Sequence, residues 1–355
     1  MSAILLLLTF GLLAIYSLSR GGAIGEFSFY QKQISFVVLG VFVFFLTALS
    51  DYTFWKIYAW PLYFLGIFLL ILVLLVGHIT NGATSWFNLG FLKFQPVELV
   101  KVGLIMILAL YFSRLKSEFL TWKDIFLSLG YTIIPVILVI MQPDYGSAII
   151  LLIIWLGMVF LAGISWQKLL ALLFVLVLTA ISGWFFFLQG YQKERILTFL
   201  DPARDSLGSG YNVIQAIIAV GSGGWRGKGL GNGSQGQLNF IPEQHTDFIF
   251  STIAEESGFL GVSLMLAVFL LLFWRLKKIV LLADTRFGSF LVNGVLVLFF
   301  FQFLINVGMN IGLVPVTGLS LPFISYGGSF LLVTMFLIGL AESVYRKSKK
   351  HFSDF

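Results

Sequence analysis

Long apolar runs separated by short polar or glycine-rich stretches recur about ten times along this chain of 355 residues. A helix needs about 20 mostly apolar residues to cross a bilayer core, and several runs reach this length only with their flanking residues. The alternation of a β-barrel strand is absent. The runs are Ile4–Tyr16, Ile34–Leu49, Pro61–Val76, Gly103–Phe112, Ile125–Met141, Ala148–Leu161, Leu169–Leu188, Gly258–Trp274, Phe290–Ile305 and Phe330–Leu340. The pattern predicts an all-α polytopic membrane protein with about ten transmembrane helices, in one membrane domain covering 1–355.

Composition supports this class and excludes others. The chain is 59% hydrophobic and 11% charged, whereas a soluble domain carries about 25% charged residues. Cysteine is absent, which excludes disulfides, zinc ribbons and a thiol nucleophile. The formal net charge of +6 needs no nucleic acid to explain it, because basic loops facing an anionic leaflet are an ordinary cause.

Charge placement predicts the topology. An even number of spans puts both termini on one side, and basic residues gather in the C-terminal tail and in the segments Arg114–Lys123 and Arg275–Arg286. The short loops of the other face hold only Arg20, Lys32 and Lys93. The positive-inside rule therefore places both termini in the cytoplasm.

The same topology makes residues 190–247 a long extracellular loop. Loops of this length are usually functional or disordered, and this one carries aromatic and branched residues among its glycines. Its apolar positions at helical spacing predict a short amphipathic helix at the membrane interface; the alternative is a plain spacer. These positions are Tyr211, Ile214, Ile217 and Ile218.

Two ionisable residues follow Pro96 at the start of an apolar run. Proline suits the first turn of a helix, and Glu98 and Lys101 are then three residues apart, close enough to pair on one face. One interpretation is a structural ion pair between packed helices. The other is a polar cavity wall that meets an anionic ligand through Lys101.

Acidic residues also mark the point where the long loop re-enters the membrane. Asp247 could be partly dehydrated there, which raises a carboxylate's pKa toward the range of a general base. Asp247 or Thr246 could equally cap a helix, and spacing alone favours the cap. Glu255 and Glu256 follow about two turns deeper, where at least one needs a cavity or a partner.

The glycine-rich stretch 221–231 is a weak phosphate signal. It lacks the Gly-Lys-Ser/Thr ending of a Walker A loop, although its backbone amides with Arg226 or Lys228 could still approach a phosphate. His245 has no partner at metal-ligand spacing in the sequence, so we do not interpret it as a ligand.

Taken in order, several segments over nearly the whole chain resemble the SEDS family (shape, elongation, division and sporulation), the group of RodA, FtsW and SpoVE. The most specific are Thr246-Asp247-Phe248-Ile249-Phe250 and Leu321-Pro322-Phe323-Ile324-Ser325-Tyr326-Gly327-Gly328-Ser329. The others are Ile15-Tyr16-Ser17, Asn81-Gly82-Ala83 with Trp86, Phe94-Gln95-Pro96 with Glu98 and Lys101, Gln142-Pro143-Asp144-Tyr145-Gly146, Arg195-Ile196 with Phe199-Leu200-Asp201-Pro202, Gly210-Tyr211 with Gln215, Pro242-Glu243 with His245, and Pro315-Val316-Thr317-Gly318. Gly233-Ser234-Gln235 and the unbroken His245-Thr246-Asp247 look closer to the RodA branch than to FtsW.

Two positions depart from the family pattern. Val97 stands where the family usually has Ser, and Ser85 stands before Trp86 where the family usually has Arg. The second change removes a possible phosphate contact or ion pair. An essential role for an arginine in that loop is therefore in doubt for this chain.

The resemblance implies a peptidoglycan glycosyltransferase of the bacterial cytoplasmic membrane, with its active site on the outer face. Such enzymes polymerise glycan strands from lipid II, releasing undecaprenyl pyrophosphate, and a RodA-like member serves cell elongation and shape. Asp247 matches the catalytic aspartate, as a base or as part of a divalent-cation site (Mg or Mn); no organic cofactor is implied. Glu98 and Lys101 match a polar pair in the central cavity, and Arg195 and Lys228 are candidates for binding pyrophosphate or ordering the loop.

The resemblance also implies partners: a class B penicillin-binding protein, which is a transpeptidase, and other elongation-complex membrane proteins, with no nucleic acid. Two other functions stay open from the residues alone. Ten helices with buried charges suit a lipid II flippase equally well, and the chain could act as a scaffold that activates the transpeptidase. An FtsW-like division role is the alternative within the family.

Overall fold

The computed structural model describes residues 1–21, 27–80, 83–88, 90, 93–117, 119–183, 185, 190–201, 209–234 and 243–353. Over these residues the backbone is mostly helical, with three short strands in a small sheet. The expected class, an all-α polytopic membrane protein, is confirmed by this architecture.

Each apolar run overlaps one helix; the part of the run Leu169–Leu188 beyond Ser182 is not in α8 and lies mostly outside the described residues. Among the described residues eight helices are long and apolar enough to span a bilayer, and α7 and α8 are shorter at 17 residues each, which is within the range that still spans. The helices are α1 (Ser2–Gly21), α2 (Phe27–Leu49), α4 (Ala59–Val76), α5 (Pro96–Arg114), α6 (Trp122–Ile140), α7 (Tyr145–Leu161), α8 (Trp166–Ser182), α12 (Ile249–Leu282), α13 (Arg286–Asn310) and α14 (Gly328–Ser353). A short helix, α3 (Tyr52–Ile57), joins α2 to α4.

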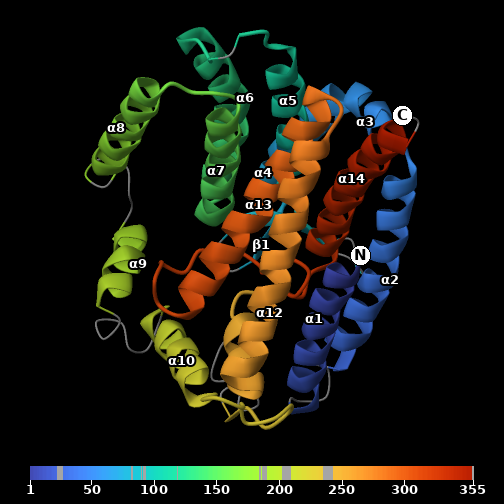
Figure 1. The fold of residues 1–355 in the computed structure, drawn as a ribbon. Helices are drawn as coiled ribbons and strands as arrows, with labels where there is room; N and C mark the ends of the chain where they lie inside the picture. Colours follow the sequence, from blue (N-terminus) through green and yellow to red (C-terminus); the bar gives the residue numbers. More distant parts are fainter. Residues whose placement is uncertain are drawn as a thin grey trace.

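Helix α5 forms the centre of the bundle. It is 83% buried over its apolar window, against 28% for α4, and it packs on α4, α6, α7, α13 and α14. Figure 1 shows α2 and α14 side by side on one flank and α8 at the opposite edge. Most side chains of α8 are exposed on every face. In a bilayer α8 therefore meets lipid over most of its surface, whereas α5 meets protein.

A small antiparallel sheet, not predicted from the sequence, lies between α4 and α5 in the chain. It comprises β1 (His78–Thr80), β2 (Ala83–Asn88) and β3 (Lys93–Phe94), in the order β1-β2-β3. Ser85, the residue that departs from the family pattern, is buried in β2 with its Oγ 3.5 Å from the carbonyl oxygen of Gln142. The position that would carry the arginine thus faces the start of α7.

Two helices occupy part of the long loop: α9 (Gly190–Leu200) and α10 (Ser209–Ser222). Helix α10 is the predicted short helix. Its buried face is Val213, Ala216 and Ala219, whereas Ile217 and Ile218 are exposed. Small residues let α10 approach its neighbours closely, which leaves the isoleucines on the outer side.

Candidate active site

The turn that carries Asp247 is held from three sides. The carbonyl oxygen of Glu243 accepts the backbone N–H of Thr246 and of Asp247, each at 3.1 Å. Asn306 and Asn310 of α13 each donate from Nδ2 to the carbonyl oxygen of Asp247 at 3.0 Å. These bonds fix the backbone of Asp247 without using its carboxylate.

The loop that precedes α14 closes the third side of this turn. The backbone N–H of Tyr326 donates to the carbonyl oxygen of His245 at 2.9 Å, and Ser325 Oγ donates to that of Thr246 at 2.6 Å. Two non-glycine residues here have left-handed backbone, Glu243 at φ 54° and Phe323 at φ 66°. Such conformations cost free energy and persist where the surroundings impose them, often at functional sites.

The Asp247 carboxylate does not cap α12. The N-cap position is Phe248, and no side-chain capping hydrogen bond is present there. The cap interpretation, which spacing favoured, is therefore wrong for this aspartate. Its side chain keeps part of its surface accessible, beside Gly318, where a Cβ atom would lie 3.6 Å from Asp247 Oδ2.

The environment of Asp247 raises its pKa from 3.8 to about 7. Desolvation by burial is the largest cause, and the negative charge of Glu243 raises the pKa further. A hydrogen bond from Thr246 lowers the pKa, and the charge of Asp144 raises it again. A carboxyl group with this pKa is partly ionised at neutral pH and can accept a proton there.

Asp144 is a second acidic residue at this site, and its role was not predicted from the sequence. It caps α7 by accepting the backbone N–H of Ser147 at 3.0 Å, and it accepts Gln95 Nε2 at 3.0 Å. Gln95 directly precedes α5, so Asp144 connects the Asp247 region to the first turn of that central helix. An acid directly before a long apolar run was the available signal, but a simple helix cap explains that pattern equally well.

Glu98 and Lys101 lie in the first turns of α5, as their spacing predicted. Lys101 Nζ is 2.6 Å from Glu98 Oε1, and the exposed fractions of the residues are 1% and 6%. The ammonium group also lies 5.9 Å from the ring centroid of Phe330 in α14. The ion pair is present in the structure, whereas a role in substrate binding stays a prediction.

Lys228 binds a buried acid of α12. Its Nζ is 2.7 Å from Glu255 Oε1 and 3.0 Å from Ser234 Oγ, and the Glu255 side chain is 0% exposed. The neighbouring Glu256 accepts the hydroxyl of Ser17 in α1 and the backbone N–H of Gly231. Both acids therefore have the partners that their burial requires.

The glycine-rich stretch places its backbone amides against α12. The N–H groups of Lys228 and Gly229 donate to the carbonyl oxygens of Glu255 and Glu256, each at 3.0 Å. The close approach needs glycine, because a Cβ on Gly227 would lie 2.1 Å from the Glu256 carbonyl oxygen. Helix α12 is kinked opposite, at Gly258 with φ 62°. These amides therefore bind the glycine-rich stretch to α12.

Arg195 belongs to α9, far along the chain from Lys228. Its helix is described, but its side chain lies outside the described residues, so its predicted contact with pyrophosphate stays a prediction.

A divalent cation would have limited protein ligation at Asp247. Among the described residues no three His, Cys, Asp or Glu side chains come together as a metal site. Mg²⁺ is often held by one or two carboxylates together with substrate phosphates and water. Asp247 fits that kind of site, with Glu243 and Asp144 as the nearby acids that act on its pKa.

Comparison with known proteins identifies the family. The family model of the FtsW, RodA and SpoVE proteins, described as "Cell cycle protein", matches residues 1–350. The chain belongs to this family. It is 38% identical to the peptidoglycan glycosyltransferase MrdB of Escherichia coli K12, over 98% of this chain and 92% of MrdB.

Solved structures of family members show the same fold. One is a chain of a peptidoglycan synthase complex that coordinates polymerization and crosslinking, with a TM-score of 0.82 and 36% identity over 98% of both chains. Another is the rod shape determining protein RodA of Thermus thermophilus, with a TM-score of 0.71 and 30% identity over 97% of this chain and 95% of that one.

Proposed function

We propose that this chain is a peptidoglycan glycosyltransferase that polymerises glycan strands from lipid II for cell elongation and shape. The observation that carries the proposal is Asp247, a partly accessible aspartate with a pKa of about 7 on a turn held by α13 and the loop before α14. Membership of the family, and the similarity to a protein named peptidoglycan glycosyltransferase over nearly the whole chain, support it.

The proposed step is glycosyl transfer between two lipid-linked sugars. The 4-hydroxyl of the acceptor GlcNAc attacks the anomeric carbon of the donor MurNAc, and a new C–O glycosidic bond forms. The bond from that carbon to the pyrophosphate oxygen breaks, and undecaprenyl pyrophosphate leaves with the bonding electrons. Asp247 accepts the hydroxyl proton, which a carboxylate with a pKa near the working pH does efficiently.

The other predicted site residues take positioning roles in this proposal. Glu98 and Lys101 form a polar wall at the start of α5, close to Gln95, which binds Asp144. Lys228 orders the loop through Glu255, which its 2.7 Å ion pair favours over a direct pyrophosphate contact. Arg195 remains the candidate cation for the pyrophosphate. A divalent cation on Asp247 would supply further positive charge for the leaving group.

A substrate with a polyprenyl tail must enter from the membrane. The sparsely covered helix α8, exposed on most of its surface at the edge of the bundle, favours entry along its side (Figure 1). The positive-inside rule supports cytoplasmic termini and an outer-face Asp247. A penicillin-binding protein partner, with transpeptidase activity, is supported by the similarity to a chain of a synthase complex that couples polymerization to crosslinking.

Polymerisation by the purified protein tests this function against the flippase and scaffold alternatives. The full chain in detergent is supplied with lipid II and Mg²⁺, without a second polymerase, and glycan strands are resolved by gel electrophoresis. We expect polymer from the wild type, none from Asp247→Asn, and normal polymer from the control Asp51→Asn, which changes an exposed acid between α2 and α3. Flipping has no meaning in detergent, so a folded wild type that makes no polymer alone or with the transpeptidase would refute the proposal.

A further inference from the structure

A cavity lies between α12, α14 and the first turn of α1, at the end of the bundle away from Asp247. Its volume is about 230 Å³. Glu342, which lines it, is 14 residues beyond Gly328, where α14 begins just after Tyr326, whose backbone N–H binds the turn that carries Asp247. At 1.5 Å per residue this corresponds to roughly 21 Å along α14. The cavity is therefore separate from the candidate active site, toward the C-terminal end of α14.

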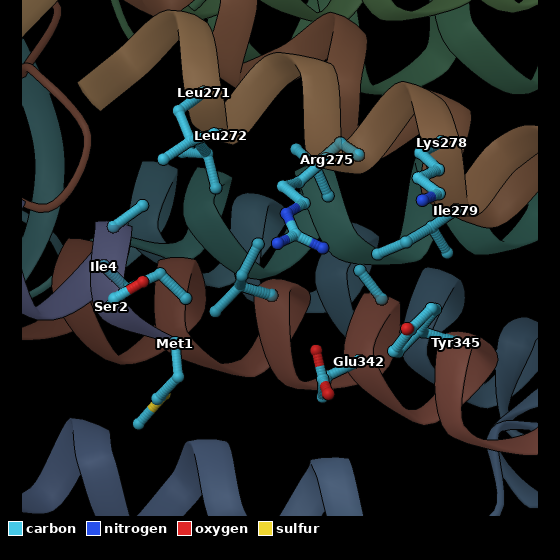
Figure 2. Close-up of a pocket in the computed structure, with 14 residues that line it drawn as sticks. Met1, Ser2, Ile4, Leu271, Leu272, Arg275, Lys278, Ile279, Glu342 and Tyr345 are labelled. Atoms are coloured by element: carbon cyan, nitrogen blue, oxygen red, sulfur yellow. The ribbon is translucent and has the colours of Figure 1, made fainter. Parts of the chain in front are cut away.

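Unpaired charges face this cavity. Arg275 and Lys278, three residues apart on α12, enter it from one side, and Glu342 and Tyr345, three apart on α14, enter from the other (Figure 2). Over the described part of the chain no ion pair joins these groups, and both cations have only the ring of Trp274 as a partner, at 5.4 Å and 5.7 Å from its centroid. Counted over side chains, two cations beside one carboxylate leave a local excess of one positive charge, and the first residue of the chain, Met1, also lines the cavity.

The other end of the cavity is apolar. Leu272 and Ile4 are buried in its wall, and Leu271 lines the same end with 42% of its surface exposed (Figure 2). Along the cavity-lining side of α12, apolar side chains are therefore followed directly by charged ones. A ligand that matches this wall has a negatively charged group next to a hydrocarbon chain.

The volume limits the occupant further. The cavity is smaller than pockets that enclose a whole drug-sized ligand, about 300–1,000 Å³. It suits a phospholipid headgroup whose acyl chains lie outside, against the surface of the bundle.

We propose that this cavity binds the headgroup of an anionic glycerophospholipid of the cytoplasmic leaflet, a phosphatidylglycerol. Its phosphodiester lies between Arg275 and Lys278, which neutralises the excess charge, and its glycerol hydroxyls meet Glu342 and Tyr345. Basic pockets between helices on the cytoplasmic side are suited to anionic headgroups. The bound lipid bridges α12 to α14 at this end of the bundle.

Native mass spectrometry of the delipidated full chain, titrated with phosphatidylglycerol, tests the proposal. With a contribution of about 1 kcal/mol per basic residue, each of Arg275→Ala and Lys278→Ala should weaken binding about fivefold, and the double variant about 25-fold. Lys277→Ala is the matched control, because Lys277 is exposed on the same turn but does not line the cavity. Glu342→Gln should tighten binding severalfold, a gain that misfolding does not produce.

Three results would overturn the proposal. The first is a double variant that binds phosphatidylglycerol within twofold of the Lys277→Ala control. The second is equal binding of phosphatidylethanolamine, which would show that the cavity does not select a net negative lipid. The third is full displacement of the lipid by soluble glycerol 3-phosphate, which would show that the site recognises a free phosphate.

Discussion

Replacing Asp247 with asparagine should stabilise the protein at pH 8 and leave its stability nearly unchanged near pH 4. The folded protein raises the pKa of this carboxyl from 3.8 to about 7. Between these values the folded state keeps a proton that the unfolded chain has lost, so the free energy of unfolding falls as pH rises from about 4 to 7. At about 1.36 kcal/mol per pH unit this cost is a little over 4 kcal/mol. Partial contact of the side chain with water makes that an upper limit.

Thermal unfolding in one detergent at pH 4.5, 6 and 8 measures this effect, read as the difference between variant and wild type at each pH. Asp51→Asn is the control with the opposite sign. Burial acts to raise the pKa of Asp51, but hydrogen bonds from Lys347 and Thr53 lower it overall, so its replacement should destabilise the protein above pH 4. The reasoning is refuted if Asp247→Asn changes the unfolding temperature equally at all three pH values, or is less stable than the wild type at pH 8.

Three further predictions concern contacts around the site. Lys228→Met leaves Glu255 buried without its cation and should lower the free energy of unfolding by about 3–5 kcal/mol. Adding Glu255→Gln to the same chain should restore most of that loss, measured by thermal unfolding. A double variant that recovers no stability would contradict the ion-pair account. Lys101→Met should likewise lower the free energy of unfolding by about 3–5 kcal/mol. The double variant with Glu98→Gln should regain stability in the same assay, but it should not regain polymerisation activity. Asn306→Ala should lower kcat for polymerisation more than it raises KM, because it loosens the backbone of Asp247; an unchanged kcat would exclude that role.

The transmembrane architecture could be predicted because the bilayer itself dictates it. Spanning helices must satisfy their own backbone hydrogen bonds over about 20 apolar residues, so each run of that kind identified one helix. The pair of Glu98 and Lys101 was equally local, since a spacing of three residues on a helix brings side chains together. Both features depend only on short-range periodicity.

Features that depend on tertiary contacts could not be predicted in the same way. Asp144 and Asp247 lie on different elements more than 100 residues apart, and only the packed bundle brings their charges close enough to raise a pKa. The partner of Lys228 depends on the approach of Gly227 to the kink at Gly258. Without those coordinates, a phosphate contact and an ion pair were equally reasonable expectations.

Two features went unpredicted for specific reasons. The sheet beginning at His78 had a local signal, because an Asn-Gly pair between two strands is typical of a hairpin, but this pair was considered only as part of the family pattern. The face of α10 that packs against protein was not predicted from the sequence. At a membrane, large residues can face lipid while small ones such as Ala216 and Ala219 pack against protein.

The initial rate of lipid II polymerisation by the purified protein between pH 5.5 and 8.5 tests the role of Asp247 most directly. The rate should rise through a midpoint near 7, because the ionised carboxylate is the base. Glu243→Gln should move that midpoint to lower pH, since the charge of Glu243 is the second cause of the raised pKa. A rate that does not change with pH over this range, or a midpoint that Glu243→Gln does not move, would contradict this account.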